Sequence, residues 1–405
     1  MKSKDFSGRP RPFQRKIIAS PEDYVPLSDQ CEVVGAFNAG ATLFRNRENL
    51  EVLLMIRVAE TPIVNLEQEN MYLPQESRFL PYFNILNRNV KKFEMKFDKI
   101  SKGDIIREGK KEIELKFHNR LKHISLPRIM KLDENFDLIE RQQSPAMYPC
   151  WEFERFGLED LRITPIQDKK ILDELGYNYA ITYVTPHRSN RVSTYIALTN
   201  DFINFKKLPF GDTPRRIIRG KDVALFPEKC LSPHKPLNKK NREYQYVALT
   251  RPDEHASIAR PGIGVAYSPD LTAWGLEHDI NGDSLDGKIR GTGSSPLKIG
   301  NLWIEAFHEI SREGDNNHYK TRLMGLDSKN PWIKKYVSDV FLERKDYYSL
   351  IPEKGYVPNV VYTTGVVEKD GAISFFSGVD DTWTVVDRFY TEDVIKFLEK
   401  GNSSL

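Results

Sequence analysis

Two ten-residue segments of this sequence repeat one pattern, and this repetition restricts the fold more than any other feature. Residues 196–205 (IALTNDFINF) and 265–274 (VAYSPDLTAW) each begin as an apolar strand, continue as a polar turn with Asp, and end in an apolar residue. Weaker copies occupy residues 129–138 and 324–332. Repeats spaced by several tens of residues are typical of β-propeller blades, which are four-stranded sheets. Since blades bury their faces against neighbouring blades, we expect a closed ring.

The rest of the pattern is mostly that of short strands rich in β-branched and aromatic residues, separated by turn residues. Strands are predicted at residues 52–58, 179–184, 194–198, 244–249, 262–267, 303–308, 360–367 and 373–377. The clearest helical pattern is Thr391–Lys400, with Thr391 as its predicted N-cap. We therefore expect an all-β propeller over residues 31–390, an N-terminal arm at 1–30, and a helix and tail at 391–405. Residues 65–120 are polar, Lys-rich and poorly repeated, which indicates an insertion.

Composition argues against several classes of protein. The chain has 405 residues, a net charge of only +3 and 11% aromatic residues, which favours a soluble globular protein without a nucleic-acid partner. We expect no membrane-spanning helix, because the chain has no run of about 18 apolar residues, and we find no secretory signal at its start. Cys31, Cys150 and Cys230 are too widely spaced for a zinc motif or a disulfide framework, so the expected location is the cytoplasm. The eight histidines show no metal-ligand spacing.

Residues 157–164 (GLEDLRIT) hold two adjacent carboxylates and an arginine between apolar residues. In a regular strand Glu159 and Asp160 would point to opposite faces, and Asp160 and Arg162 to the same face. Leu158 and Leu161 break that alternation, which predicts a bend. A carboxylate at a strand end beside a guanidinium can act as a general acid or base. A structural ion pair is the alternative interpretation.

Further clusters place polar groups at the ends of predicted strands, which in a propeller can converge on the central channel. They are residues 37–41 (FNAGA) before a strand that ends in 57–60 (RVAE), 221–229 (KDVALFPEK), 249–252 (LTRP), 291–296 (GTGSSP), and 357–362 (VPNVVY) before 378–382 (GVDDT).

Together, and in this order, these segments resemble glycoside hydrolase family 130, the β-mannoside phosphorylases and their β-1,2-mannosidase relatives. The resemblance runs from about residue 37 to residue 382. The family pattern Gly-Val-Glu-Asp-Pro-Arg-Ile reads here with Leu158 for Val and Leu161 for Pro. The resemblance implies a five-bladed propeller with a central active-site pocket and no metal or organic cofactor.

The resemblance also implies a reaction. Asp160 would be the general acid and would protonate the leaving group through a hydroxyl of the substrate mannose. Inorganic phosphate, the co-substrate, would attack the anomeric carbon from the opposite face and give α-mannose 1-phosphate with inverted configuration. Because the nucleophile is already an anion, no second carboxylate is needed to activate it. A cationic cradle for phosphate is needed instead.

By resemblance and position, the candidate site residues fall into three groups. The expected sugar-binding residues are Asn38, Arg57, Glu159, Asp222 and Asp381, with Trp303, Tyr362 or Trp383 stacking on the sugar. The expected phosphate ligands are Lys221, Lys229, Arg251 and His255, with Arg260, Arg188 and Arg191 as further cations nearby. If water replaces phosphate, the base would be Glu305, Glu309 or Glu228.

Two departures from the family pattern leave alternatives open. Residues 303–309 (WIEAFHE) stand where family members commonly read Trp-Leu-x-Ile-Tyr-His-Gly, and they add the two acids Glu305 and Glu309. A β-mannosidase that uses water is therefore the second hypothesis, and a non-catalytic carbohydrate-binding propeller is the third. The expected partner is an oligosaccharide. Family members are often oligomers, and the sequence leaves open whether this chain is a homo-oligomer. It also leaves open the linkage and length of the substrate.

Overall fold

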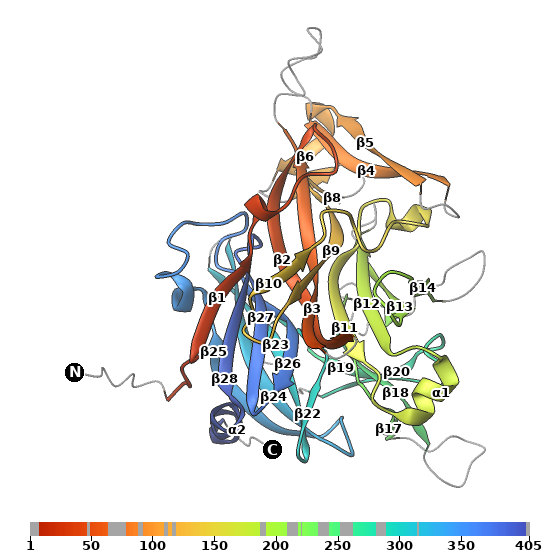
Figure 1. Cartoon of the computed structure of the whole chain (residues 1–405). Coiled ribbons are helices and arrows are strands. Elements are labelled where there is room, and N and C mark those ends of the chain that lie inside the picture. Colours follow the sequence, from red (N-terminus) through yellow and green to blue (C-terminus); the bar gives the residue numbers. More distant parts are fainter. Residues whose placement is uncertain are drawn as a thin grey trace.

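The computed structural model describes residues 8–46, 49–63, 78–87, 92–108, 112–115, 119–186, 192–208, 218–219, 221–233, 243–251, 262–280, 289–313 and 316–401. The described strands include five antiparallel sheets arranged in a ring, with two α-helices on the outside (Figure 1). This confirms the all-β, five-bladed propeller. Among the described residues, no helix is long and apolar enough to cross a membrane.

Each sheet is one blade, and in each blade the first strand after the crossover lies innermost. Listed from the inside outwards, the first blade has β2 (Cys31–Asn46), β3 (Asn49–Pro62), β9 (Ile124–Leu132) and β10 (Leu138–Arg141). The second has β11 (Glu159–Pro165), β12 (Tyr179–Pro186), β13 (Val192–Thr199) and β14 (Lys206–Lys207), with β15 (Ile218–Arg219) also on β13. The third has β16 (Lys221–Leu225), β18 (Tyr244–Arg251), β19 (Gly264–Ser268) and β20 (Gly275–Asp279), with β17 (Cys230–Leu231) on β18.

The last two blades complete the ring. The fourth has β21 (Ile289–Thr292), β23 (Leu302–Glu313), β24 (Asn316–Asp327) and β25 (Lys334–Leu342), with β22 (Leu297–Ile299) on β23. The fifth has β26 (Val361–Lys369), β27 (Ala372–Val379), β28 (Trp383–Tyr390) and, as its outer strand, β1 (Gln14–Ala19) from the other end of the chain. Every strand predicted from the sequence is present.

The outer strand of the fifth blade differs from the expected N-terminal arm at residues 1–30. Gln14–Ala19 pairs antiparallel with β28, with Gln14 opposite Arg388 and Ile17 opposite Val385. Ile18 and Ala19 are buried in the core between the fifth and first blades. Closure of the ring needs a fourth strand for the last blade, and β1 supplies it.

The hydrophobic core is divided into one cluster between each pair of neighbouring blades. Val52 and Val386, for example, belong to the cluster between the first and fifth blades, whereas Ala180 and Ala248 belong to the cluster between the second and third. Corresponding clusters lie between blades one and two, three and four, and four and five. Because each blade face is covered only by the adjacent blade, the apolar pattern of the strands specifies stacking in a ring.

The repeated segments occupy equivalent places. Residues 196–205 and 265–274 each run from the third strand of a blade into the turn before the fourth strand, and so do the weaker copies at 129–138 and 324–332. In the two best copies, Asp201 Oδ1 accepts hydrogen bonds from the backbone of Ile203 and Asn204, and Asp270 Oδ1 from that of Thr272 and Ala273. The apolar residue that follows Asp in these copies has a positive φ and is buried.

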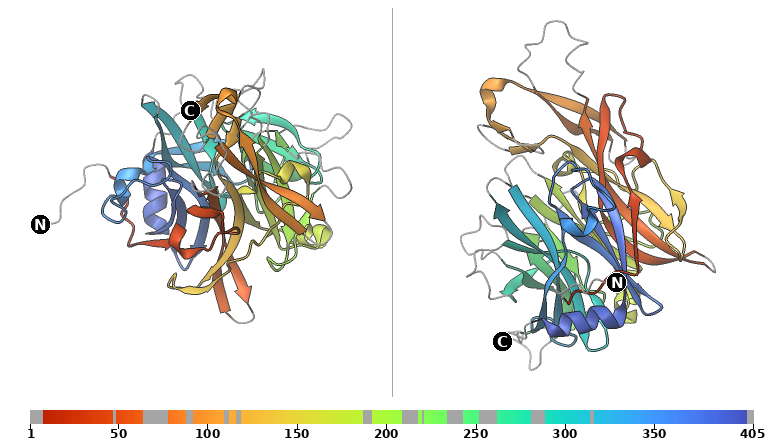
Figure 2. Two further views of the ribbon diagram at one scale, coloured as in Figure 1. Left: turned by 90° about the horizontal axis from the view of Figure 1, so that it is seen from above. Right: turned by 90° about the vertical axis from the view of Figure 1, so that its left-hand side faces the viewer.

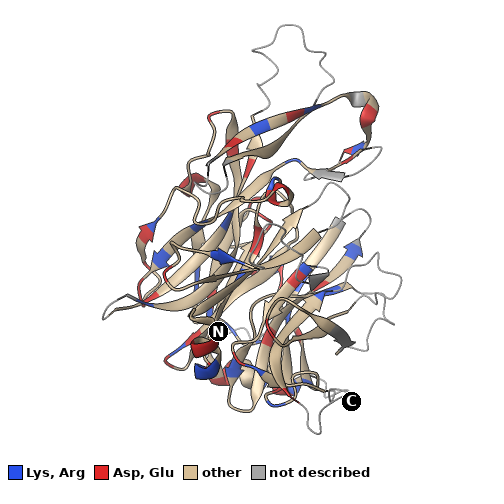
Figure 3. Cartoon of the chain, turned by 90° about the vertical axis from the view of Figure 1, so that its right-hand side faces the viewer, with Lys and Arg blue, Asp and Glu red and all other residues tan. Residues whose placement is uncertain are grey.

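An insertion between β3 and β9 forms a hairpin of β4 (Arg78–Asn87) and β5 (Lys92–Ile100) and a small sheet of β6 (Ile105–Glu108), β7 (Glu112–Leu115) and β8 (Asn119–Leu121). It rises above one face of the ring (Figures 1 and 2) and has a small core of its own, formed by Leu80, Ile113 and Leu115. Lys, Arg, Asp and Glu are interspersed on the insertion and the blades (Figure 3).

The helices are peripheral. α2 (Thr391–Lys400) is present as predicted, but its N-cap is Tyr390 and no side chain caps it, so Thr391 is already helical. α1 (Lys169–Leu175) was not predicted; Asp168 caps it and Gly176 ends it in the left-handed region. Single turns of 3-10 helix lie at η1 (Pro21–Asp23), η3 (Lys102–Asp104), η4 (Glu152–Glu154) and η6 (Arg344–Tyr347).

Candidate active site

Three neighbouring innermost strands are interrupted by a β-bulge, and each bulge carries one polar site residue. The pairing register shifts between Phe37 and Gly40 in β2, between Glu159 and Arg162 in β11, and between Lys221 and Ala224 in β16. The residues in these bulges with positive φ are Asn38 (51°), Asp160 (49°) and Asp222 (57°). A positive φ is uncommon outside glycine, though Asn and Asp tolerate it best, and such conformations gather at functional sites. The bulges redirect these three side chains from the regular alternation of the strand.

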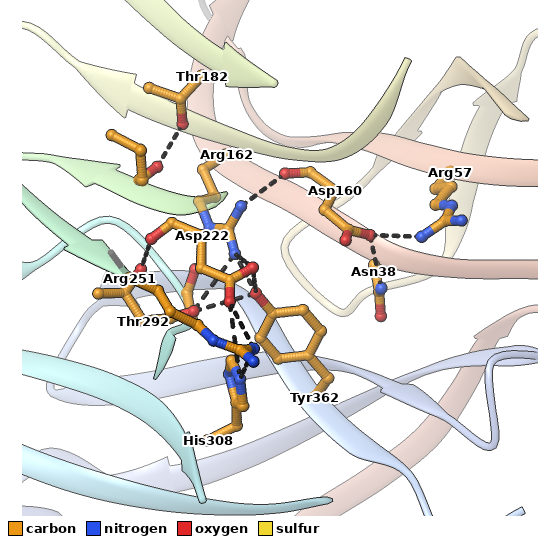
Figure 4. A network of polar contacts seen from close by, with 12 residues as sticks. Asn38, Arg57, Asp160, Arg162, Thr182, Asp222, Arg251, Thr292, His308 and Tyr362 are labelled. Atoms are coloured by element: carbon orange, nitrogen blue, oxygen red, sulfur yellow. Dashed lines mark hydrogen bonds and ion pairs between the residues drawn. The ribbon is translucent and has the colours of Figure 1, made fainter. Parts of the chain in front are cut away.

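Asp160 is held on one side only. Its Oδ1 accepts a hydrogen bond from Asn38 Nδ2 at 2.8 Å and another from an Arg57 amino group at 2.8 Å (Figure 4). Within the described part of the chain, Oδ2 has no hydrogen-bond partner. The Asp160 side chain is 18% exposed, more than Arg57 or Asp222. The hydrogen bonds to described residues are therefore all on one carboxyl oxygen, Oδ1.

Glu159 and Asp160 both form ion pairs with the guanidinium of Arg57. One of its amino groups binds Asp160, and the other binds Glu159 Oε1 at 2.6 Å. Regular alternation predicted opposite faces for the two carboxylates, but the bulge at Asp160 brings them together; the predicted bend is present. Glu159 is buried in this ion pair and supports Arg57, and its expected contact with a sugar stays a prediction.

The charges around Asp160 favour its ionised form in this structure. Burial alone would raise the pKa of Asp160, but the charges of Arg57 and Arg162 and the hydrogen bond from Asn38 lower it overall. Asp222 opposes this effect, because a second negative charge raises the pKa of Asp160. For Arg57, burial lowers the pKa, but Glu159, Asp160 and Asp381 raise it more, so the guanidinium stays charged.

Arg162 connects Asp160 to a second polar group around Asp222. It donates to the backbone carbonyl of Asp160 at 2.8 Å and approaches Asp222 Oδ1 at 3.4 Å. It also bonds the carbonyl of Gly293 and the hydroxyl of Tyr362, which in turn donates to Asp222 Oδ1 at 3.0 Å. Side chains from β11, β16 and β26 thus meet in one buried network (Figure 4).

Arg251 and His308 complete the surroundings of Asp222. An Arg251 amino group lies 3.3 Å from Asp222 Oδ2, and His308 Nε2 lies 3.7 Å from the same oxygen. Gly291, opposite His308 in the strand pairing, makes this approach possible, since a Cβ there would lie 2.5 Å from His308 Cε1 and 2.6 Å from Asp222 Oδ2.

His308 and Asp222, the two titratable groups of this second cluster, are both harder to protonate than the free side chains. Burial, reinforced by Arg251, Lys221 and Arg162, lowers the pKa of His308 to about 3 although Asp222 raises it, so the imidazole is neutral near pH 7. Burial alone would raise the pKa of Asp222, but the charges of His308, which is protonated only at low pH, and of Arg251 and Arg162 lower it well below its usual range. The cluster therefore holds one carboxylate among three cations and a neutral imidazole.

The structure brings together nine of the residues predicted for the site. Asn38 and Arg57 contact Asp160, Glu159 and Asp381 lie near Arg57, and Lys221, Arg251 and Tyr362 surround Asp222. Tyr362 serves through its hydroxyl, within the network, instead of as a stacking ring.

Other predicted residues lie elsewhere. Trp303 is fully buried in the core between the third and fourth blades, where its indole N–H donates to Ser328, so it cannot stack on a sugar. Trp383 belongs to the core between the fourth and fifth blades. Lys229 binds Glu174 of α1 at 2.7 Å and covers the Tyr246 ring, away from the Asp222 cluster. His255, Arg260, Arg188 and Arg191 lie outside the described residues.

The three carboxylates considered as bases for water are all engaged in other contacts. Glu305 is fully buried; burial raises its pKa well above the usual range, and its Oε1 accepts the Gly293 N–H at 2.9 Å. Glu309 is buried between Arg290 and Arg322, at 3.0 and 2.8 Å. Glu228 pairs with Lys298 at the surface. Glu305 and Glu309 lie on β23, and Glu228 lies in the turn between β16 and β17.

Three residues of the site were not among those predicted from the sequence. Arg162 was considered only as the guanidinium beside Asp160 in residues 157–164. His308 was noted only as part of the segment 303–309, and its pairing opposite Gly291 could have placed it beside the channel. His123, whose Nε2 lies 2.9 Å from an Arg57 amino group, follows the poorly repeated insertion and gave no signal. Among the described residues, no group of three or more His, Cys, Asp or Glu is arranged to hold a metal ion.

The sequence matches a family of known proteins. The sequence model of a family described as beta-1,4-mannooligosaccharide phosphorylase, glycoside hydrolase family 130, matches residues 70–400. The chain belongs to glycoside hydrolase family 130. Among the members of this family, the β-1,2-mannobiose phosphorylase of Listeria innocua is 27% identical over 379 residues, which cover 91% of this chain and 93% of that protein. A 1,2-β-oligomannan phosphorylase of Thermoanaerobacter sp. is 31% identical over 251 residues, 60% of this chain and 71% of the relative.

Solved structures of family 130 show the same fold. The complex of the Listeria innocua enzyme with β-1,2-mannobiose superposes with a TM-score of 0.72 at 26% identity, covering 94% of this chain and 96% of that one. A structure reported for family 130 glycoside hydrolases that target β-1,2 mannosidic linkages in Candida mannan gives 0.58 at 13% identity, with 97% and 96% coverage. At that identity it shows the propeller fold alone.

Proposed function

We propose that this protein is an inverting phosphorylase that cleaves β-mannosidic bonds in manno-oligosaccharides with inorganic phosphate and releases α-mannose 1-phosphate. One observation carries the proposal: Asp160, whose Oδ2 has no hydrogen-bond partner among the described residues, lies beside a cluster that contains Arg162, Arg251 and Lys221. A water-using enzyme would need a second carboxylate about 6.5–9.5 Å from the acid, placed to activate water. Glu305, Glu309 and Glu228 are committed to other partners.

In this proposal Asp160 acts through Oδ2. Arg57 and Asn38 keep both of their hydrogen bonds on Oδ1, so a proton on Oδ2 does not disturb them. The leaving group would receive that proton through a hydroxyl of the bound mannose. The carboxyl is ionised before ligands bind, and a phosphate dianion nearby would raise its pKa, as a second negative charge does. Binding of the nucleophile would therefore favour the protonated acid that the leaving group requires.

The cations of the second cluster would hold phosphate. Arg162, Arg251 and Lys221 come from different strands, and a guanidinium presents paired N–H donors that match the oxygen spacing of phosphate. His308 is neutral, so it can donate one further N–H without adding to the positive charge of these three cations. No metal or organic cofactor takes part in this scheme. We also propose residence in the cytoplasm, where a cell can use the sugar phosphate directly.

The linkage is proposed from the relatives. Two of the relatives above are named for β-1,2-linked substrates, so β-1,2-mannobiose is the first substrate to test.

The purified protein should be incubated with β-1,2- and with β-1,4-mannobiose, with and without inorganic phosphate, and the products separated. We expect mannose 1-phosphate only in the presence of phosphate. Free mannose released at the same rate in both would show a hydrolase instead.

A further inference from the structure

The position of Arg57 decides how Asp160 is supported. All three guanidinium nitrogens are bound: Nε to Ser125 Oγ at 3.1 Å, one amino group to Asp160, and the other to Glu159 and to His123 Nε2 at 2.9 Å. The guanidinium lies 4.8 Å from the centroid of the Phe37 ring and is buried. Because it is a rigid planar fork, the contacts of one amino group determine where the other meets Asp160.

His123 is held by its second nitrogen. A guanidinium has donors only, so Nε2 of His123 must accept the hydrogen bond from Arg57. In the neutral imidazole, Nδ1 then carries the hydrogen, and Nδ1 lies 3.3 Å from the hydroxyl of Tyr356. The two rings meet edge to face at 5.6 Å and 77°. Arg57 therefore fixes Nε2 as the accepting nitrogen, and the contact of Nδ1 with Tyr356 holds the orientation of the imidazole.

The segment that carries Tyr356 is itself fixed to the fifth blade. Its backbone N–H donates to Thr382 Oγ1 at 2.7 Å. On either side, the N–H of Gly355 and of Asn359 donate to Asp380, which also pairs with Arg344 at 2.7 Å. His123, in contrast, lies where the insertion rejoins the first blade at β9. Contacts from the first, second and fifth blades thus converge on Arg57.

We propose that His123 and Tyr356 are positioning residues, which hold Arg57 in the orientation that supports Asp160 during phosphorolysis. The role rests on the proposed function, because it matters only if Asp160 is the acid. Among the described residues, the charged and titratable groups in contact with His123 include Arg57 from β3, Glu159 from β11 and Tyr356 from the segment before β26. A protonated His123 would oppose Arg57 and compete with it for Glu159, whose Oε1 is 3.6 Å from Nε2.

The test compares substitutions that keep or remove the acceptor. His123→Leu removes it, whereas His123→Gln can place an amide oxygen near the position of Nε2. Tyr356→Phe keeps the ring and removes the hydroxyl, and Tyr348→Phe is the matched control at an exposed tyrosine. For each variant, kcat, KM for phosphate and the pH profile of kcat/KM are measured on β-1,2-mannobiose, and the melting temperature reports folding.

We expect His123→Leu to lower kcat about 10- to 100-fold, the range for one hydrogen bond to a charged group, with KM for phosphate little changed. Tyr356→Phe should lower kcat about 2- to 10-fold, and His123→Gln should keep most of the activity. The acid works protonated, and Arg57 lowers its pKa. Weaker support from Arg57 must therefore move the alkaline limb of the profile to higher pH, which a merely structural loss would not do.

An unchanged kcat and an unmoved alkaline limb in His123→Leu would overturn the proposal. Equal losses in His123→Gln and His123→Leu without a shift of that limb would overturn it as well. Should His123→Leu fail to fold, Tyr356→Phe and His123→Gln decide by the same criteria. The products of the unmodified protein show separately whether phosphate is the nucleophile. The kcat of each variant relative to the unmodified protein can be measured whether the product is mannose 1-phosphate or free mannose.

Discussion

At the scale of single residues, Asp160 depends on an asymmetry between its two oxygens. Oδ1 carries the hydrogen bonds from Asn38 and Arg57, and Oδ2 remains open to a ligand. The same donors that orient the carboxyl also favour its ionised form. An acid held in this way needs a change in its electrostatic surroundings before it can donate a proton, and a bound phosphate anion would supply one.

Replacement of Asp160 by Asn should abolish turnover without loss of the fold. Asn tolerates the positive φ of 49° at this position and keeps a carbonyl oxygen for Arg57, but it has no acidic proton. We expect kcat to fall about 100- to 10,000-fold, with a melting temperature close to that of the unmodified protein. Activity assays and thermal melts check this. Retained activity would exclude Asp160 as the acid.

Arg251 and Lys229 offer a matched pair of cations. Arg251 lies against Asp222 in the buried cluster, whereas Lys229 binds Glu174 at the surface. Arg251→Ala should raise KM for phosphate about 10- to 100-fold, since a charge-assisted hydrogen bond is lost. Lys229→Ala should leave it unchanged. Phosphate titrations at saturating mannobiose give the KM of each variant. A raised KM in Lys229→Ala and an unchanged KM in Arg251→Ala would place the phosphate site at Lys229 instead.

At the scale of elements, the bulges of β2, β11 and β16 build the site. A regular strand would send Glu159 and Asp160 to opposite faces, and only the left-handed backbone at Asp160 lets both contact Arg57. The sequence showed that the alternation fails near Leu158 and Leu161, but a failed alternation does not say in which direction the chain turns. The pairing partners β12, β3 and β18 decide that.

A glycine in the neighbouring blade makes room for the bulge of β2. A Cβ on Gly378 would lie 2.1 Å from Asn38 Oδ1, a contact that side chains cannot make. Gly378→Ala should therefore displace Asn38 from Asp160 and lower kcat about tenfold, as loss of one hydrogen bond to a charged group would. Gly275→Ala, where a Cβ meets nothing within 4 Å, is the control. Equal activity of both variants would contradict this role.

The turn between the third and fourth strands is the element that the sequence describes best. Its signature is local. An Asp accepts hydrogen bonds from the backbone N–H groups two and three residues later, and the apolar residue that follows the Asp is buried in the core. Because the interaction spans only a few residues, it repeats in recognisable form at 196–205 and 265–274. The fifth blade has no such turn, since its fourth strand is β1.

At the scale of the whole molecule, closure of the ring depends on β1. Arg15 on this strand binds the fully buried Asp387 of β28, and Tyr347 of η6 donates to the same carboxylate at 2.7 Å. Burial raises the pKa of Asp387, although Arg15 and Tyr347 lower it. The contact therefore ties the first described strand to the last across the fifth blade.

Two adjacent residues of β1 test this closure. Arg15→Ala leaves a buried carboxylate without its cation and should reduce the free energy of unfolding by about 3 kcal/mol. Lys16→Ala breaks an exposed pair with Asp137 and one hydrogen bond to the carbonyl of Phe136, and the expected loss is below about 1 kcal/mol. Urea denaturation followed by tryptophan fluorescence measures both. Similar losses in the two variants would mean that the Arg15–Asp387 pair is not what closes the ring.

The sequence alone determined the strands, their ring-like stacking and the segments that supply the site, because strand patterns, turns and short motifs depend on residues close together in the chain. It also placed Asp160, Asn38, Arg57, Asp222 and Arg251 correctly near one centre. Tertiary structure decided the rest. Whether Glu305 or Trp303 faces the channel depends on register and burial, and the contacts of His123 with Arg57 and Tyr356 join residues 66 and 233 positions apart. No local pattern encodes contacts across such separations; packing of the blades around one axis creates them.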